Sequence, residues 1–436
     1  MHSDQPSVPA SPVTPSTSGP SRQSCRGWVR GLATTLACLG LAGTLPAPAA
    51  AVKLPEGFVR EAIAGPELTE PVDLEFAPDG SLWVCGRQGH VWRVDTVTKA
   101  SHLVGKIPAE ASGDRGLHGF AFHPDFGRTH QVFAFYNAPT NAPSKILSRV
   151  SRFVVRGNGA GSTLDLGSEK RLLEFAFNDF GQHVGGALLA HPREKALYIS
   201  TGDNNEIGRL KEYCNDPENQ AQSLKDLRGK VLRIGFDGSI PKDNPFVRTP
   251  GARGEIYTRG HRQPWQLTYD APTGWVLLAE NGGDQNDDHD EVNRLSPGLN
   301  CGWPRVFADG WETLTRTNRV AGFPAPWFSY LRNTGASSTG ALLYRPPTKA
   351  KGGTPFPSRF HGGLFYADYN RKSVRFAPVD PKAQHPGKSE AFAQNFTGGP
   401  VALRLGPDGA LYLAEYGGWF QGTTNDAISR IVWKKP

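Results

Sequence analysis

The chain has 436 residues and a formal net charge of +7, with 38% hydrophobic and 20% charged residues. This positive charge is mild for the length, and no run of lysine and arginine is interleaved with aromatic residues, so nothing favours nucleic-acid binding. Its 51 glycines and 36 prolines, with almost no helical periodicity, favour short strands joined by turns.

The first 51 residues have the pattern of a secretory signal. Arg22, Arg26 and Arg30 precede an apolar segment, residues 31–45, and small residues follow at 47–51. This is the order of a cleaved signal peptide, and the apolar segment is too short to span a bilayer. We therefore expect residues 1–51 to be a signal peptide with a disordered N-terminus. A lipoprotein signal through Cys38 is the alternative.

The mature chain, 52–436, contains no apolar run long enough to cross a membrane, so we expect a periplasmic or secreted protein without a membrane span. Three cysteines remain in it, Cys85, Cys214 and Cys301, and an oxidising compartment permits one disulfide between any two of them. No Cys-x-x-Cys pattern occurs, so neither a zinc site nor a c-type haem is indicated.

An internal repeat predicts the architecture of the mature chain. In its clearest copies, 74–84 and 403–413, alternating apolar residues lie on both sides of a Pro-Asp-Gly turn. Proline presets such a turn and Asp-Gly reverses the chain between two half-buried strands, so each copy predicts a hairpin. Looser copies occur around Phe120, Ala187, Leu267 and Leu342, which makes six in total.

Six hairpins in series predict an all-β fold, a single six-bladed β-propeller over 52–436. We expect the last strand, 428–433, to pair with the first, 58–63, because this pairing removes a free sheet edge. An open β-sandwich with long loops is the alternative. The longest insertion, 203–228, is long enough for us to expect that it has a function.

Polar residues at the ends of inner strands can converge at one end of a propeller channel although they are distant in sequence. His183 stands before a predicted strand, next to Gly185 and Gly186, and Asp203 ends the other strand of the same hairpin. A carboxylate that holds an imidazole in one tautomer makes it a general base at neutral pH. A structural, hydrogen-bonding histidine is the alternative.

The next repeat opens with two further candidates. Arg262 is suited to clamp a carboxylate or to stabilise developing negative charge, and Trp265 offers a flat face on which a ring can stack. A surface arginine and a core tryptophan are the alternatives.

The most acidic stretch, 280–291, suits a hard cation. It alternates carboxylates with glycine carbonyls, which are the oxygen ligands that Ca²⁺ prefers, and it lacks the spacing of an EF-hand. A merely solvated acidic loop is the alternative. The candidate ligands are Gly282, Gly283, Asp284, Asp287 and Asp288.

Taken together, the motifs resemble the glucose/sorbosone dehydrogenase family, soluble quinoprotein sugar dehydrogenases that bind pyrroloquinoline quinone (PQQ) on a six-bladed propeller. The resemblance follows the order of the family's motifs from about Pro71 to Asp408. It rests on the segments 116–126, 183–186, 202–203, 229–234, 237–245, 260–264, 290–293 and 300–304.

By this resemblance His183 is the general base, Asp203 orients it, and Arg262 lies at the reactive carbonyl of the quinone. Gly282 and Gly283 match the pair whose backbone oxygens hold the Ca²⁺ that bridges to the cofactor. The implied reaction is oxidation of a sugar, or a related aldehyde or alcohol, at its hemiacetal carbon. The base takes the hydroxyl proton while a hydride passes to the quinone.

The chain departs from the family's pattern at the expected cofactor site. Gln182 stands where the best-known glucose enzymes have an acidic residue, Gln263 replaces an asparagine, and Asp114 replaces a cofactor-binding glutamine. These three residues are still expected to contact the cofactor.

A pair of arginines that grips the cofactor's carboxylates in the family is missing from 398–403, which reads Gly-Gly-Pro-Val-Ala-Leu. PQQ has three carboxylates, so we expect Arg371 or Lys372 to supply the missing charge.

Three hypotheses about function follow. The first is an exported PQQ-dependent and Ca²⁺-dependent dehydrogenase that oxidises a sugar and passes electrons to an acceptor the sequence does not identify. The second is a non-catalytic Ca²⁺-binding propeller that binds carbohydrate or a protein partner. The third is a Ca²⁺-dependent lactonase, which would need carboxylates around the axis, whereas the acidic residues here cluster in one loop.

Overall fold

The computed structural model describes residues 51–435 except 65–66, 143, 179–181, 205–209, 217, 286, 309, 314–316, 334–336 and 419–424. The predicted signal segment, with Cys38, therefore lies outside the described residues apart from its last position. Within the described ranges, no helix has the length and apolar character needed to cross a membrane.

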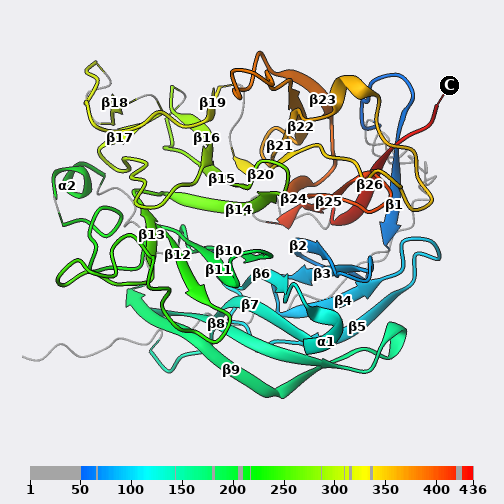
Figure 1. Ribbon diagram of the computed structural model, residues 1–436, viewed down its shortest axis with the longest axis horizontal. Coiled ribbons are helices and arrows are strands. Elements are labelled where there is room, and N and C mark those ends of the chain that lie inside the picture. The colour runs from blue at the N-terminus through cyan, green and yellow to red at the C-terminus, as the bar shows by residue number, and fades with distance from the viewer. Residues whose placement is uncertain are drawn as a thin grey trace, which may run out of the picture. The chain divides into compact units, whose positions relative to one another are not determined.

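Six four-stranded antiparallel sheets follow one another around a central axis, so the fold is the predicted six-bladed β-propeller (Figure 1). The first strand of each sheet contacts the first strand of the next, and these inner strands surround the axis. The first two blades are β2 (Pro71–Phe76), β3 (Leu82–Gly86), β4 (His90–Val94) and β5 (Ser101–Lys106), then β6 (Leu117–Phe122), β7 (Gln131–Ala138), β8 (Lys145–Arg156) and β9 (Thr163–Asn178).

The remaining blades have the same order from the axis outward. The third and fourth are β10 (Gly185–His191), β11 (Ala196–Thr201), β12 (Lys230–Gly235) and β13 (Ile256–Arg259), then β14 (Gln263–Asp270), β15 (Trp275–Asn281), β16 (His289–Arg294) and β19 (Phe328–Leu331). The fifth is β20 (Ser338–Leu343), β21 (Leu364–Asp368), β22 (Ser373–Ala377) and β23 (Glu390–Gln394), and the sixth is β24 (Gly399–Leu405), β25 (Leu411–Tyr416), β26 (Ala427–Trp433) and β1 (Phe58–Ala64).

Helices are few and short among the described residues. They are α1 (Phe126–Thr129), α2 (Leu210–Asn215) and the 3-10 turns η1 (Gly159–Gly161) and η2 (Ser358–Phe360), and a small two-stranded sheet consists of β17 (Val306–Phe307) and β18 (Trp311–Glu312).

All six predicted hairpins are the two innermost strands of a blade. In the turn between β2 and β3, Gly80 has a φ of 88°, which an L side chain rarely adopts. The Asp79 carboxylate accepts hydrogen bonds from the backbone N–H and the hydroxyl of Ser81, at 2.8 and 2.6 Å. The turn residues of the repeat are therefore explained by their own geometry.

The sixth blade closes the ring in the predicted way, because its outer strand comes from the other end of the described chain. β1 pairs antiparallel with β26, with Phe58 opposite Trp433 and Ala62 opposite Ser429. The six largest apolar clusters each lie between two neighbouring blades. Burial of these side chains holds adjacent blades together and so fixes the loops at the ends of the channel.

The three described cysteines, Cys85, Cys214 and Cys301, are free thiols, so none of the disulfides considered between them is formed.

Candidate active site

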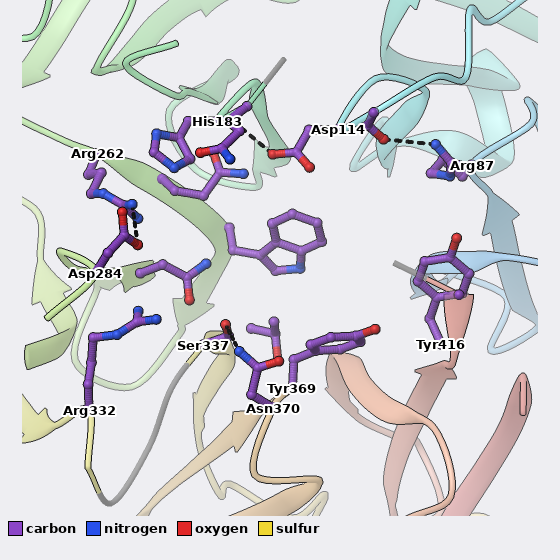
Figure 2. A pocket seen from close by; sticks show the side chains of 17 residues that line it. Arg87, Asp114, His183, Arg262, Asp284, Arg332, Ser337, Tyr369, Asn370 and Tyr416 are labelled. Carbon is purple, nitrogen blue, oxygen red and sulfur yellow. Dashed lines mark hydrogen bonds and ion pairs between the residues drawn. The ribbon is translucent and has the colours of Figure 1, made fainter. Parts of the chain in front are cut away.

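A cavity of about 660 Å³ opens at the end of the channel where the inner hairpins begin and finish, opposite their turns (Figure 2). Seven of the residues selected from the sequence line it, although they come from the second, third and fourth blades and the loops before them. They are Asp114, Gln182, His183, Arg262, Gln263, Trp265 and Asp284.

The His183 imidazole and the Asp203 carboxylate form the predicted pair. Nδ1 of His183 lies 2.7 Å from Oδ1 of Asp203, whose side chain is fully buried. A carboxylate can only accept, so the shared proton belongs to Nδ1 and the lone pair to Nε2. The second Asp203 oxygen accepts a hydrogen bond from the indole N–H of Trp303, at 2.7 Å.

The backbone at His183 is held in an unusual conformation, with a φ of 54°. Its N–H donates to the Asp114 carboxylate at 2.9 Å, and a side chain on Gly202 would collide with the His183 carbonyl. The glycine at 202 therefore allows the two ends of the hairpin to approach, and Asp114 fixes the base from the cavity side.

The Arg262 guanidinium is 7% exposed and donates to the Asp284 carboxylate at 2.6 Å (Figure 2). Its backbone N–H donates to Glu280 at 2.7 Å, which anchors the start of the strand. Desolvation by the surrounding protein raises the pKa of Asp284, but the positive charges of Arg262 and Arg332 outweigh it and hold that pKa below its ordinary value.

Two more predicted residues are fixed by backbone contacts. The Gln263 side-chain oxygen accepts from the N–H of Gly185 at 3.0 Å, and the Trp265 indole donates to the backbone oxygen of Val401 at 2.8 Å. Gln182 lines the cavity, and its backbone oxygen accepts from Asn204. Trp265 thus spans the channel from the fourth to the sixth blade at the cavity.

The acidic loop is ordered by one of its own carboxylates. Asp288 is buried and accepts from the backbone N–H of Gln285 at 2.7 Å, while a side chain on Gly283 would collide with that carboxylate. Gly282 donates its N–H to Asp290 at 3.0 Å, and Asp287 is exposed. Among the residues described, no three His, Cys, Asp or Glu side chains come together as a metal-binding group.

Arg371 and Lys372 are not among the described residues that line the cavity. The turn between β21 and β22 directs the Lys372 ammonium to the backbone oxygen of Thr397, at 2.9 Å, and leaves Arg371 exposed. The preceding residues, Tyr369 and Asn370, line the cavity in their place.

Two arginines that were not predicted as site residues bring positive charge to the cavity. Arg87 follows β3 and donates to the backbone oxygens of Gly113 and Arg115, and Arg332 follows β19 and lies 3.4 Å from Asp290. Arg332 stands near Asp284 on the wall that carries Arg262, with Arg87 across the cavity (Figure 2).

Other residues missed from the sequence are the aromatic Tyr416 and the amide of Asn281, both at the ends of second strands. The Asn281 side-chain oxygen is buried and has no hydrogen-bond partner among the described residues. The signal that selected Asp203, a polar residue at the end of the second strand of a hairpin, would also have selected Arg87 and Asn281.

The sequence profile of the Glucose / Sorbosone dehydrogenase family matches residues 68–418, most of the propeller. The chain belongs to the glucose/sorbosone dehydrogenase family. Quinoprotein glucose dehydrogenase B of Acinetobacter calcoaceticus is 31% identical over 265 residues, which are 58% of this chain and 53% of that protein. The match to this relative thus spans about half of its length.

The family's fold also appears in a solved structure, the PQQ-bound form of an aldose sugar dehydrogenase from Streptomyces coelicolor. It has a TM-score of 0.67 at 24% identity and covers 88% of this chain and 99% of that one. A relative with a different name is the human Hedgehog-interacting protein, 25% identical over 232 residues, which are 49% of this chain and 31% of that protein.

Proposed function

We propose that this family member is a PQQ-dependent and Ca²⁺-dependent sugar dehydrogenase. The observation that carries the proposal is the His183–Asp203 pair, which shares one cavity with the buried guanidinium of Arg262. This arrangement supplies a base with a fixed tautomer beside a positive charge, as proton removal from a hydroxyl requires.

The cavity is chemically suited to a flat, anionic quinone. Three guanidinium groups, those of Arg87, Arg262 and Arg332, line it together with the rings of Trp265 and Tyr369. Arginine binds carboxylates in a fork geometry and aromatic rings stack on planar groups, so these residues would hold PQQ although the family's arginine pair is missing.

A cation would be held beside it by oxygen atoms of the acidic loop. The unpartnered oxygen of Asn281 is an amide carbonyl of the type that Ca²⁺ accepts, and Gly282 and Gly283 add backbone oxygens in the next two residues. The exposed Asp284 carboxylate adds the charge that favours a divalent ion.

The chain's own groups then act on the sugar. Nε2 of His183 takes the proton of the anomeric hydroxyl while Asp203 holds the resulting imidazolium. Arg262 stabilises the negative charge that develops in the cavity. PQQ, when bound, supplies the two-electron oxidant.

We also infer that the mature protein works in the periplasm or outside the cell, because residues 1–51 have the order of a signal peptide. N-terminal sequencing of the exported protein tests this. A mature chain that begins near residue 52 supports it, and an intact first residue inside the cell contradicts it.

The test of the proposed activity is reconstitution of purified 52–436 with PQQ and Ca²⁺, followed by dye reduction with a panel of aldoses. We expect tight binding and turnover, and His183→Ala should abolish turnover while cofactor affinity changes by less than about three-fold. No binding at micromolar PQQ would favour the second hypothesis, a non-catalytic propeller that binds carbohydrate or a protein partner. The match to the Hedgehog-interacting protein supports that hypothesis.

A further inference from the structure

Trp303 contacts both Asp203 and Arg262, although no role was predicted for it. Its indole N–H donates to Oδ2 of Asp203 at 2.7 Å, while the other oxygen of that carboxylate is bonded to His183. The guanidinium carbon of Arg262 lies 5.6 Å from the centre of the Trp303 ring. The side chain is buried, with 6% of the residue exposed.

The insertion at 203–228 holds Trp303 in place. The amide of Gln222 donates to the Trp303 backbone oxygen at 2.7 Å. Outside the insertion, the Trp303 backbone N–H donates to the backbone oxygen of Gly260 at 3.1 Å. The indole also packs with Tyr213 and Ala221 of the insertion in a small apolar cluster. The described residues of the insertion thus support Trp303 from two sides.

We propose that Trp303 is a positioning residue that fixes the orientation of Asp203 and thereby the contact of its carboxylate with Nδ1 of His183. An indole N–H can only donate, so the atom of residue 203 that faces it must be an acceptor. With one carboxylate oxygen committed to Trp303, the other is held toward Nδ1 of His183. This proposal rests on the proposed function, in which Nε2 of His183 must carry the lone pair.

A carboxamide at position 203 makes the effect of Trp303 visible. In Asp203→Asn, Trp303 takes the amide oxygen, so the NH₂ group faces Nδ1 of His183 and drives the imidazole proton to Nε2. In the double variant with Trp303→Phe, the indole no longer holds the amide oxygen, so we expect that oxygen to turn toward His183 and the proton to return to Nδ1.

The first experiment needs no cofactor. The nitrogen chemical shifts of the His183 ring, assigned with His183→Gln, report which ring nitrogen carries the proton. We expect Nδ1–H in the wild type and in Trp303→Phe, Nε2–H in Asp203→Asn, and a return to Nδ1–H in the double variant. An Asp203→Asn protein that keeps Nδ1–H overturns the proposal, even if Trp303→Phe does not fold.

The second experiment measures turnover of the same reconstituted proteins. We expect Trp303→Phe to lower kcat by about ten-fold with little change in KM, and the double variant to be at least about ten-fold faster than Asp203→Asn. Additive losses in the double variant overturn the proposal. If the wild type itself has no turnover, the proposed function fails while the tautomer result still decides the role of Trp303.

Trp327 provides the matched control. It is similarly buried, and its indole N–H donates to the backbone oxygen of Gln384 at 2.8 Å. Trp327→Phe therefore loses an equivalent hydrogen bond without touching the pair. We expect it to leave the His183 tautomer and kcat unchanged, and an equal fall in kcat would reduce the effect of Trp303→Phe to lost stability.

Discussion

Replacing Arg332 by glutamine should weaken PQQ binding by about ten- to hundred-fold. The guanidinium lines the cavity with its side chain 17% exposed, so a carboxylate bound there is partly removed from water. A hydrogen bond to a charged group in such a place contributes about 1.5–3 kcal/mol, and each 1.4 kcal/mol is about a factor of ten in affinity.

The same substitution should cost little stability. The pKa of Asp290, the partner of Arg332, is raised by burial to about 6, and loss of Arg332 raises it further. The carboxyl can therefore take up a proton instead of remaining as an unpaired buried charge. It also keeps its hydrogen bonds from the N–H groups of Gly282 and Ser338, both at 3.0 Å.

The assay is a titration of the apo protein with PQQ, followed by quenching of tryptophan fluorescence with and without Ca²⁺. Arg371→Gln is the matched control, because Arg371 is exposed and is not among the described residues that line the cavity. If Arg332→Gln binds within about two-fold of the wild type while Arg371→Gln binds weakly, the assignment of cofactor charge to Arg332 is refuted.

Three further predictions concern the base, the cation and the pH dependence of stability. Asp203→Asn should lower kcat by about 10³–10⁴-fold with the fold retained, as measured by dye reduction and circular dichroism, and a loss of less than about ten-fold would contradict the orienting role. Asn281→Ala should raise the Ca²⁺ concentration that restores activity after chelation by about ten-fold, and an unchanged requirement would exclude its side chain as a ligand. Burial, and then the nearby Glu280 carboxylate, raise the pKa of Glu291 from 4.5 to about 8, so between these values the folded protein keeps a proton that the unfolded chain releases. The free energy of unfolding should therefore fall as pH rises from about 5 to 8. Glu291→Gln should reduce that slope by about 1 kcal/mol per pH unit in denaturant titrations. An unaltered slope would show that Glu291 does not titrate in this way.

The fold could be predicted from the sequence because each blade repeats the same local chemistry. The Pro-Asp-Gly turns and alternating strands act within about ten residues, so they are visible without knowledge of the tertiary structure. Closure of the ring by β1 and β26 followed from the general cost of a free sheet edge. The blades follow one another in chain order, so their arrangement could be predicted from the order of the hairpins alone.

The candidate site could be predicted in part. His183, Arg262 and Trp265 were found because they stand at strand ends in recognisable motifs, and all three line the cavity. Arg87 stands at a strand end of the same kind but in no recognisable motif, and nothing in the local sequence of Arg332 indicates the direction of its side chain.

Arg371 and Lys372, by contrast, were predicted to contact the cofactor in place of the arginine pair but do not line the described cavity. Arg371 and Lys372 are close in sequence to the cavity residues Tyr369 and Asn370, but Lys372 has a φ of 47° in the turn, and its side chain reaches Thr397. Charge alone selected these residues, while turn geometry decided where they point.

The proposed sugar oxidation is tested most directly by an anaerobic single turnover of the protein reconstituted with PQQ and Ca²⁺. We expect an aldose to bleach the quinone absorption of the wild type completely, in proportion to bound cofactor, and to leave that of His183→Ala unchanged over the same time. Bleaching at equal rates in both proteins would contradict the assignment of His183 as the base in this cavity. A wild type that binds PQQ tightly but is not bleached by any aldose would contradict the proposed activity itself.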